Sequence, residues 1–251
     1  MVSIDLNCDM GESFGAWQMG NDAALMDYVS SVNIACGFHA GDASVIRKTI
    51  EAAIEKGVAV GAHPSFPDLQ GFGRRAMSLS VQEVFDVVLY QIAAVKGICE
   101  TLGEKLHHVK PHGALYNQAA IDADLAEAIA KAVEAIDENL ILYGLSGSFL
   151  ISEAEKIGLR TASEVFADRT YQSNGTLTPR NLANALITDT EKAVSQVLQM
   201  ISEQSVTAIN GETISLKAET VCIHGDGAHA LEFAKTINAK LKKKGINIER
   251  I

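Results

Sequence analysis

The chain has 251 residues, with 21 basic and 31 acidic side chains and a formal net charge of −10. This balance argues against a nucleic-acid binder, which needs a surplus of lysine and arginine to displace counterions from phosphates. Apolar residues make up 47% of the chain and charged residues 21%, the composition of an ordinary globular protein. No stretch approaches the roughly 20 consecutive apolar residues of a membrane-spanning helix, so we expect neither nucleic acid nor membrane as a partner.

The first residues and the cysteines indicate where the protein resides. Asp5 interrupts the apolar stretch that a signal peptide would need, so export is not expected. The cysteines form no C-x-x-C pair and no dense framework (Cys8, Cys36, Cys99 and Cys222). They are typical of reduced thiols, and we expect a cytoplasmic protein.

Seven short, mostly apolar runs alternate with longer amphipathic stretches from one end of the chain to the other. Runs of this kind are typical of parallel strands that are covered on both faces. The predicted strands are residues 2–8, 32–36, 58–62, 108–111, 140–144, 160–166 and 220–224.

Capping residues predict where several of the intervening helices begin. Asp42 precedes an apolar-periodic stretch that ends at Gly57. Ser80 and Glu83 have the spacing of a capping box, ahead of a long helix. Asp122 starts another amphipathic stretch.

Two further signals complete the predicted fold. Thr178 and Pro179 supply a cap and a first-turn proline for a shorter helix. Asn210-Gly211 stands between two short alternating runs, which predicts a hairpin near residues 206–216. Strand–helix alternation without a linker predicts a single α/β domain over residues 1–251, a (β/α) barrel-like fold of about seven parallel strands.

Ionisable and hydrogen-bonding residues follow nearly every predicted strand. In α/β folds the functional sites form at the carboxyl ends of the strands. One such residue is more often a helix cap or a satisfied core group, but histidines at four strand ends favour a functional site. The candidates are Asp9, Glu12, His39, His63, Lys110, His112, Asn117, Asp168, Arg169 and His224.

Asp9, His39 and His63 follow three successive strands and are expected to converge. Two imidazoles and a carboxylate suit Zn²⁺ or a similar divalent ion such as Mg²⁺, with an open position for water. The same residues also suit a hydrogen-bonded His–Asp network in which one histidine acts as a general base. Glu12 would place a second carboxylate near Asp9 and raise the pKa of Asp9. Both interpretations of the three residues stay open.

Phosphate binding has a weaker signal. The chain contains no G-x-x-x-x-G-K-[ST] sequence, which excludes a P-loop. Gly225-Asp226-Gly227 follows the last predicted strand and precedes a helix, where backbone N–H groups can hold an anion. A tight strand-to-helix turn would need the same glycines.

Residues 64–79 form an unusually long connection that carries Arg74 and Arg75. A mobile lid whose arginines clamp a carboxylate or a phosphate is one interpretation. A surface loop with two solvated arginines is the other.

Seven sequence blocks resemble the LamB/YcsF family over nearly the whole chain. They are NCDMGES (7–13), NIACGFHAGD (33–42), GAHPSFPD (61–68), GFGRR (71–75), VKPHGALYN (109–117), EVFADRTY (164–171) and CIHGD (222–226). The resemblance implies a seven-stranded barrel related to the glycoside hydrolase/deacetylase class. It also implies one component of an ATP-dependent 5-oxoprolinase, which opens the lactam 5-oxo-L-proline to L-glutamate together with subunits B and C.

That reaction assigns expected roles to the strand-end residues. Phosphoryl transfer from ATP to the lactam oxygen would be stabilised by Lys110, Arg74 or the Gly225–Gly227 turn. Asp9, His39 or His63 would then deprotonate the attacking water, with Asp168 as a further candidate. Arg74 or Arg75 would hold the substrate carboxylate. Substrate or phosphate binding is expected of Glu12, His112, Asn117, Arg169, His224 and Asp226.

Two alternative functions remain. The first is a stand-alone, metal-dependent amidohydrolase or deacetylase on the same scaffold. The second is a non-catalytic subunit that binds the lactam and passes it to a partner.

Overall fold

Seven parallel strands form a closed barrel, which confirms the predicted fold class. The computed structural model describes residues 2–225 and 230–251. The strands pair in the order β1 (Ser3–Met10), β2 (Ser31–Ala35), β3 (Ala59–His63), β4 (His108–Val109), β5 (Ile141–Leu145), β6 (Arg160–Phe166) and β9 (Thr220–Ile223). β9 also pairs with β1, which places Leu6 beside Val221 and closes the barrel.

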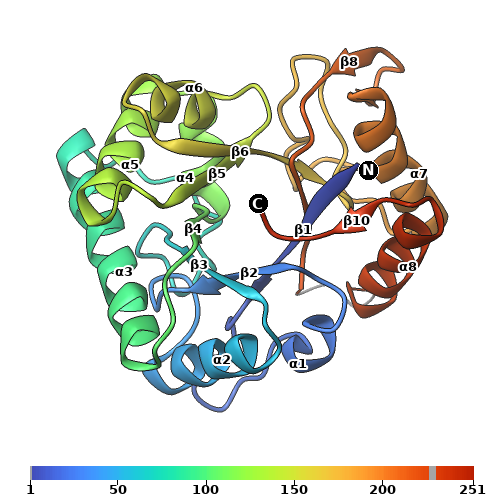
Figure 1. Ribbon diagram of the computed structural model, residues 1–251. Coiled ribbons are helices and arrows are strands. Elements are labelled where there is room, and N and C mark those ends of the chain that lie inside the picture. The colour runs from blue at the N-terminus through green and yellow to red at the C-terminus, as the bar shows by residue number, and fades with distance from the viewer. Residues whose placement is uncertain (1, 226–229) are drawn as a thin grey trace.

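Helices surround the barrel on all sides (Figure 1). Those in the described part of the chain are α1 (Asp22–Leu25), α2 (Ala43–Glu55), α3 (Val81–Thr101), α4 (Gly113–Ala119), α5 (Ala123–Ile136), α6 (Phe149–Lys156), α7 (Thr190–Glu203) and α8 (Ala230–Lys243). Three predicted helix starts are confirmed. The carboxylates of Asp42 and Asp122 accept hydrogen bonds from the first turns of α2 and α5, and Ser80 forms a capping box with Glu83 in α3. None of the described helices is long and apolar enough to cross a membrane.

The helix predicted at Thr178 is wrong. The Thr178 hydroxyl accepts hydrogen bonds from Thr170 and Gln172, so it cannot cap a helix. The chain from β6 to α7 instead forms turns and isolated bridges, and α7 begins only after its N-cap Asp189.

The predicted hairpin is confirmed, and one short strand was not predicted. β7 (Ser205–Thr207) and β8 (Thr213–Ser215) pair antiparallel on either side of the Asn210-Gly211 turn. β10 (Asn247–Ile248) pairs with the first residues of β1, outside the closed barrel. A strand of two residues is too short to show a hydrophobic period in the sequence.

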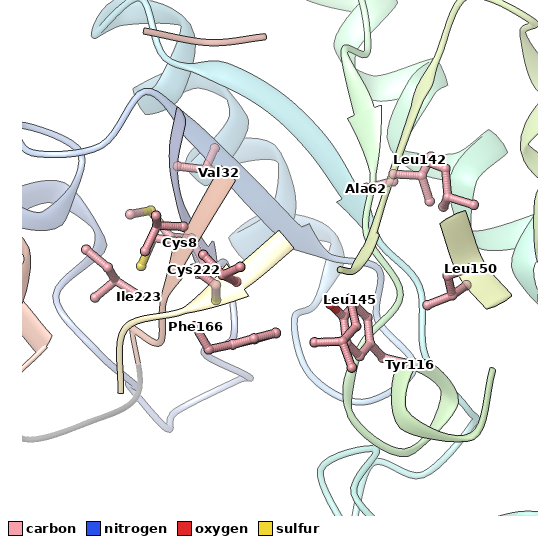
Figure 2. Close-up of a cluster of buried hydrophobic side chains, with 14 of the residues drawn as sticks. Cys8, Val32, Ala62, Tyr116, Leu142, Leu145, Leu150, Phe166, Cys222 and Ile223 are labelled. Carbon is pink, nitrogen blue, oxygen red and sulfur yellow. The ribbon is translucent and has the colours of Figure 1, made fainter. Parts of the chain in front are cut away.

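The two faces of β1 have opposite chemistry. One face belongs to the hydrophobic core between barrel and helices and carries Ile4, Leu6, Cys8 and Met10. The other face carries Asp5, Asn7 and Asp9, which are buried and hydrogen-bond to side chains of other barrel strands. Figure 2 shows part of the apolar layer, including Leu142 of β5 and Leu150 of α6. β1 therefore turns an apolar face to the helices and a polar face to the barrel interior.

Candidate active site

A pocket of about 530 Å³ opens at the carboxyl ends of the barrel strands. Its polar lining includes Asp9, His63, Lys110, His112, His224 and three arginines, Arg74, Arg169 and Arg180. Tyr116, Leu145, Phe166 and Leu177 contribute apolar walls. A concave site with apolar walls and a few convergent polar groups is typical of a small-molecule site.

Asp9, at the end of β1, forms a buried ion pair with Lys110. Asp9 Oδ1 accepts hydrogen bonds from Lys110 Nζ at 2.9 Å and from Asn33 Nδ2 at 2.8 Å. Lys110 Nζ also lies 3.0 Å from Glu164 Oε1. Burial disfavours the charged form of Lys110, but the carboxylates of Asp9 and Glu164 outweigh it and raise the lysine pKa well above its usual range. Both Asp9 and Lys110 therefore carry charge at neutral pH.

The expected rise in the pKa of Asp9 is wrong. Burial acts in that direction, but His63 and Lys110 outweigh it and hold the pKa of Asp9 well below its usual range. The Glu12 carboxylate instead contacts His39, with 3.1 Å between Glu12 Oε1 and His39 Nε2. His63 and Lys110 together thus favour the charged form of Asp9.

Three histidines from three strand ends meet beside Asp9. The rings of His39 and His112 stack with centroids 3.7 Å apart, and His63 lies edge-on to both. One ligand atom from each of Glu12, His39, His63 and His112 lies within 4.8 Å of those from the others. Burial lowers the pKa values of His39 and His112 well below their usual range, with repulsion from neighbouring imidazoles as a second cause. These two histidines are therefore neutral at neutral pH.

Backbone carbonyls fix which nitrogens of His63 and His112 carry hydrogen. His63 Nδ1 lies 2.6 Å from the carbonyl oxygen of Lys110, and His112 Nε2 lies 2.9 Å from that of Phe72. A carbonyl only accepts, so both of these nitrogens are N–H donors. The other nitrogens, His63 Nε2 and His112 Nδ1, face each other at 2.9 Å, where a hydrogen on one of them or a shared cation can join the two rings. Metal-binding histidines are held by carbonyls in this way, so the group fits a divalent cation.

The four-residue group differs from the predicted metal set. It contains His39 and His63 as expected, and it also contains Glu12 and His112. Asp9 is not part of this group, although its Oδ2 lies 3.4 Å from His63 Nε2. Asp9 belongs to a second group of ligand types with Cys222 and His224. The Lys110 ammonium contacts Asp9 and lies 3.0 Å from Cys222 Sγ, so the second group already has an internal cation.

The two arginines of the β3–α3 connection have different environments. The Arg74 guanidinium lines the pocket and lies over the Phe72 ring at 4.7 Å from its centroid. The Arg75 side chain is largely exposed and forms an ion pair with Asp68 in its own loop. Of these two arginines, Arg74 is the one that lines the pocket and can contact a ligand there.

The β6 and β9 ends contribute an acid–histidine pair and a buried arginine. His224 Nδ1 lies 2.8 Å from Asp168 Oδ1, and His224 lines the pocket. The Arg169 guanidinium donates to the backbone carbonyls of Thr178 and Ala185, and burial lowers its pKa to about 10.

The remaining predicted residues are Asn117 and the residues after β9. The Asn117 amide lines the pocket and donates to the Gly113 carbonyl. A Cβ on Gly225 would lie 2.6 Å from the Asp9 carbonyl oxygen, so glycine is required for this close approach. Asp226 and Gly227 lie outside the described residues.

Sequence reasoning placed Asn7 with Asp9 and Glu12 at the end of the first strand, but it missed Asn33 and Arg180. Asn33 lies within β2, and the alternation of Asp5, Asn7 and Asp9 along β1 is the signal that marks a polar barrel interior. Arg180 lies in the stretch that was predicted as a helix.

Comparison with known proteins extends over the whole chain. A curated relative from Tolumonas auensis, named as the A subunit of 5-oxoprolinase, is 60% identical over 249 residues and covers 99% of both chains. A relative of the same name from Bacillus subtilis is 58% identical and covers 100% of this chain and 98% of its own.

Solved structures agree with the fold. The lactam utilization protein from Thermus thermophilus superposes with a TM-score of 0.94 at 45% identity, and the match covers 100% of both chains. A family 4 carbohydrate esterase from Streptomyces lividans matches with a TM-score of 0.53 at 14% identity, covering 100% of this chain and 93% of its own. This distant match shows the fold alone.

The sequence blocks around the site are those of a defined family. The model of the LamB/YcsF family matches residues 4–251, a range that includes every residue of the pocket. The chain therefore belongs to the LamB/YcsF family.

Proposed function

We propose that this chain is the ring-opening subunit of an ATP-dependent 5-oxoprolinase. The relatives named as the A subunit of 5-oxoprolinase and the lactam utilization protein support the substrate class. The observation that carries the proposal is the pairing of an ionised Asp9 with neutral, convergent histidines in a pocket of small-molecule size. Such a site combines a proton acceptor with groups that activate a carbonyl and water.

Asp9 is the proposed general base. Its Oδ1 is occupied by Asn33 and Lys110, which leaves Oδ2 facing His63 at 3.4 Å. The attacking water gives its proton to Oδ2 while its oxygen bonds to the lactam carbon. A divalent cation held by Glu12, His39, His63 and His112 would supply Lewis-acid activation of the water or the carbonyl.

His224 is the proposed proton donor to the departing ring nitrogen. The Asp168 carboxylate contacts Nδ1 of His224, as a carboxylate does in acid–base histidine pairs. The His224 ring also lines the pocket. The arginines at the same pocket would hold the anionic groups of the substrate. Among them, Arg169 is fixed by two backbone carbonyls and offers a guanidinium of fixed orientation.

ATP makes the lactam carbon reactive in the proposed sequence. Transfer of the phosphoryl group to the lactam oxygen releases ADP, and water then adds to the carbon. Cleavage of the C–N bond leaves an acyl phosphate, which a second water hydrolyses to glutamate and phosphate. The chain lacks a P-loop sequence, so we assign nucleotide binding to the partner subunits B and C.

The test is an assay of glutamate and ADP formation from 5-oxoproline. We expect little turnover by this chain alone, ATP-dependent glutamate release when subunits B and C are added, and loss of that release when this chain is omitted. Glutamate release by subunits B and C without this chain would contradict the proposal.

A stand-alone, metal-dependent amidohydrolase is the second candidate. The group of Glu12 with three histidines favours it. Robust glutamate release from the purified chain with added Zn²⁺ and without ATP would support this candidate over the first.

A further inference from the structure

A column of hydrogen-bonded side chains extends from the site into the barrel interior. It contains residues that the proposed chemistry does not use, namely Asn7, Asn33, His108, Tyr143, Thr220 and Asp5. All six are at most 1% exposed. A buried polar group without a hydrogen-bond partner destabilises the fold. Every donor and acceptor in this column is therefore expected to have a partner.

The Asn33 amide is fixed in one orientation by its contacts. Asn33 Nδ2 donates to Asp9 Oδ1 and to Asn7 Oδ1, each at 2.8 Å. Both acceptors are already oriented, because Lys110 Nζ donates to the same two oxygens. Asn33 must therefore turn its nitrogen toward Asp9, and its Oδ1 needs a donor from elsewhere.

His108 is that donor. Its Nε2 lies 2.8 Å from Asn33 Oδ1, which requires hydrogen on Nε2. The His108 ring stacks on Tyr143 with centroids 4.1 Å apart, and the Tyr143 hydroxyl donates to Asp5. Gly61 of β3 makes room for the ring, because a Cβ at this position would lie 2.2 Å from His108 Nε2. The ring is thus held on three sides.

We propose that His108 and Asn33 are positioning residues for Asp9. His108 orients the Asn33 amide, and Asn33 together with Lys110 occupies Oδ1 of Asp9, so that only Oδ2 remains for the pocket. Without the His108 donor, Asn33 Oδ1 loses its partner, and only the two contacts of Nδ2 hold the amide against Asp9. This inference rests on the proposed role of Asp9, because it concerns the side chains of the barrel interior that hold the Asp9 carboxylate in place.

The test compares two substitutions at one position in the complete enzyme with its partner subunits. His108→Gln keeps a nitrogen donor near the position of Nε2, whereas His108→Leu has similar bulk and no donor. We expect His108→Leu to lower kcat by about 10- to 100-fold, the usual effect of losing an outer partner of a site, with KM and bound metal unchanged. His108→Gln should recover most of kcat.

Two controls separate positioning from general destabilisation. Asn238→Leu removes a buried asparagine of α8 whose amide donates to the Tyr28 carbonyl and which does not line the pocket, and it should leave kcat unchanged in the folded protein. If His108→Leu fails to fold, Asn33→Asp keeps the shape and replaces the donor to Asp9 by a carboxylate oxygen, and should lower kcat in the protein that folds. The ¹⁵N chemical shifts of His108 should show hydrogen on Nε2, a readout that needs no activity.

Equal kcat values for wild type and His108→Leu, or equal losses in the Leu and Gln variants, would overturn the inference. So would hydrogen on Nδ1 of His108 instead of Nε2. A wild-type complex without activity would instead contradict the proposed function, and the ¹⁵N measurement would still test the orientation of the column.

Discussion

At the scale of single residues, two imidazole nitrogens that face each other at close distance dominate the site. His63 Nε2 and His112 Nδ1 are 2.9 Å apart, and backbone carbonyls hold the hydrogens of both rings on the far nitrogens. Lone pairs at this separation repel unless a cation or a proton lies between them. The Glu12 carboxylate lies next to the third ring, that of His39, and adds an oxygen ligand for a divalent ion.

We therefore expect about one divalent ion per chain in protein purified without chelators. Elemental analysis should find the ion in wild type and in His224→Gln, whose imidazole is outside the four-residue group. His112→Gln should lose most of it, because that substitution removes a ligand nitrogen. Wild type without bound metal, and with full activity in the complete enzyme after EDTA treatment, would assign the histidines to acid–base work.

The Asp168–His224 pair predicts a pH-dependent contribution to stability. Burial raises the pKa of Asp168, but the attraction and hydrogen bond of His224 outweigh it, and the pKa lies below its ordinary value. The pair therefore stabilises the fold above the pKa of a free carboxyl group, about 3.9, and this contribution is lost as pH falls through the lowered value.

Asp168→Asn should lower the free energy of unfolding by about 1.5–3 kcal/mol at pH 7, the usual worth of a hydrogen bond to a charged group. Urea unfolding at pH 7 and at about pH 3 should show the difference from wild type shrinking at the lower pH. The exposed Asp86→Asn serves as the control and should change little at either pH. A difference that stays constant with pH would contradict the assignment.

Some of these residues were predictable from the sequence, and others were not. Asp9, His39 and His63 follow predicted strands, so their convergence follows from the parallel arrangement alone. Asn33 lies inside a strand, and its role depends on which face of β2 turns into the barrel. Only closure of the barrel decides that orientation, and a single short strand of mostly apolar residues does not reveal it.

At the scale of elements, the connection between β3 and α3 packs against His39 and His112 and forms a hydrogen bond with His112. The Phe72 carbonyl accepts from His112, and the Gly73 carbonyl accepts from the backbone of Ala114 in α4. Gly73 has a φ of +62°, and a Cβ there would lie 2.8 Å from His39 Cβ and 2.9 Å from His112 Cδ2. The connection thus forms one wall of the histidine group through a position that only glycine fits.

Gly73→Ala should therefore weaken the site and the fold together. We expect a loss of about 1–2 kcal/mol in the free energy of unfolding from the backbone conformation alone, with reduced metal content as the rings are displaced. Gly97→Ala is the matched control, because it lies within α3 with no atom within 4 Å of the added Cβ. That substitution should be neutral or stabilise by up to about 1 kcal/mol.

Thermal unfolding and elemental analysis of both variants check this prediction. A Gly73→Ala protein with wild-type stability and metal content would show that the loop moves freely away from the histidines.

Local signals predicted most elements, and tertiary contacts explain the exceptions. The caps at Asp42, Ser80 and Asp122 appear in the structure because their partners lie within the next three residues. The signal at Thr178 failed because its hydroxyl is engaged by Thr170 and Gln172, which lie earlier in the chain. β10 depends on pairing with β1 at the other end of the chain, and no local pattern records that contact.

At the scale of the whole molecule, closure of the barrel by β9 against β1 brings the two ends of the chain to one site. Asp9 comes from β1, Lys110 follows β4, and Cys222 lies on β9, yet the Lys110 ammonium contacts both of the others. The apolar exterior packs the helices, and the polar interior orients the charged groups at its open end. The site is thus a property of the closed barrel.

The proposed reaction requires Asp9 to accept a proton during opening of the lactam ring. Asp9→Asn tests it most directly, because asparagine is nearly isosteric and keeps an oxygen that accepts from Asn33 and Lys110. The measurement is the rate of ATP-dependent glutamate formation by the variant in complex with subunits B and C. We predict intact folding and assembly with turnover lowered by about 10²-fold or more, the scale of losing a general base. Near-normal turnover by the Asp9→Asn enzyme would contradict the account and leave Asp9 with a structural role.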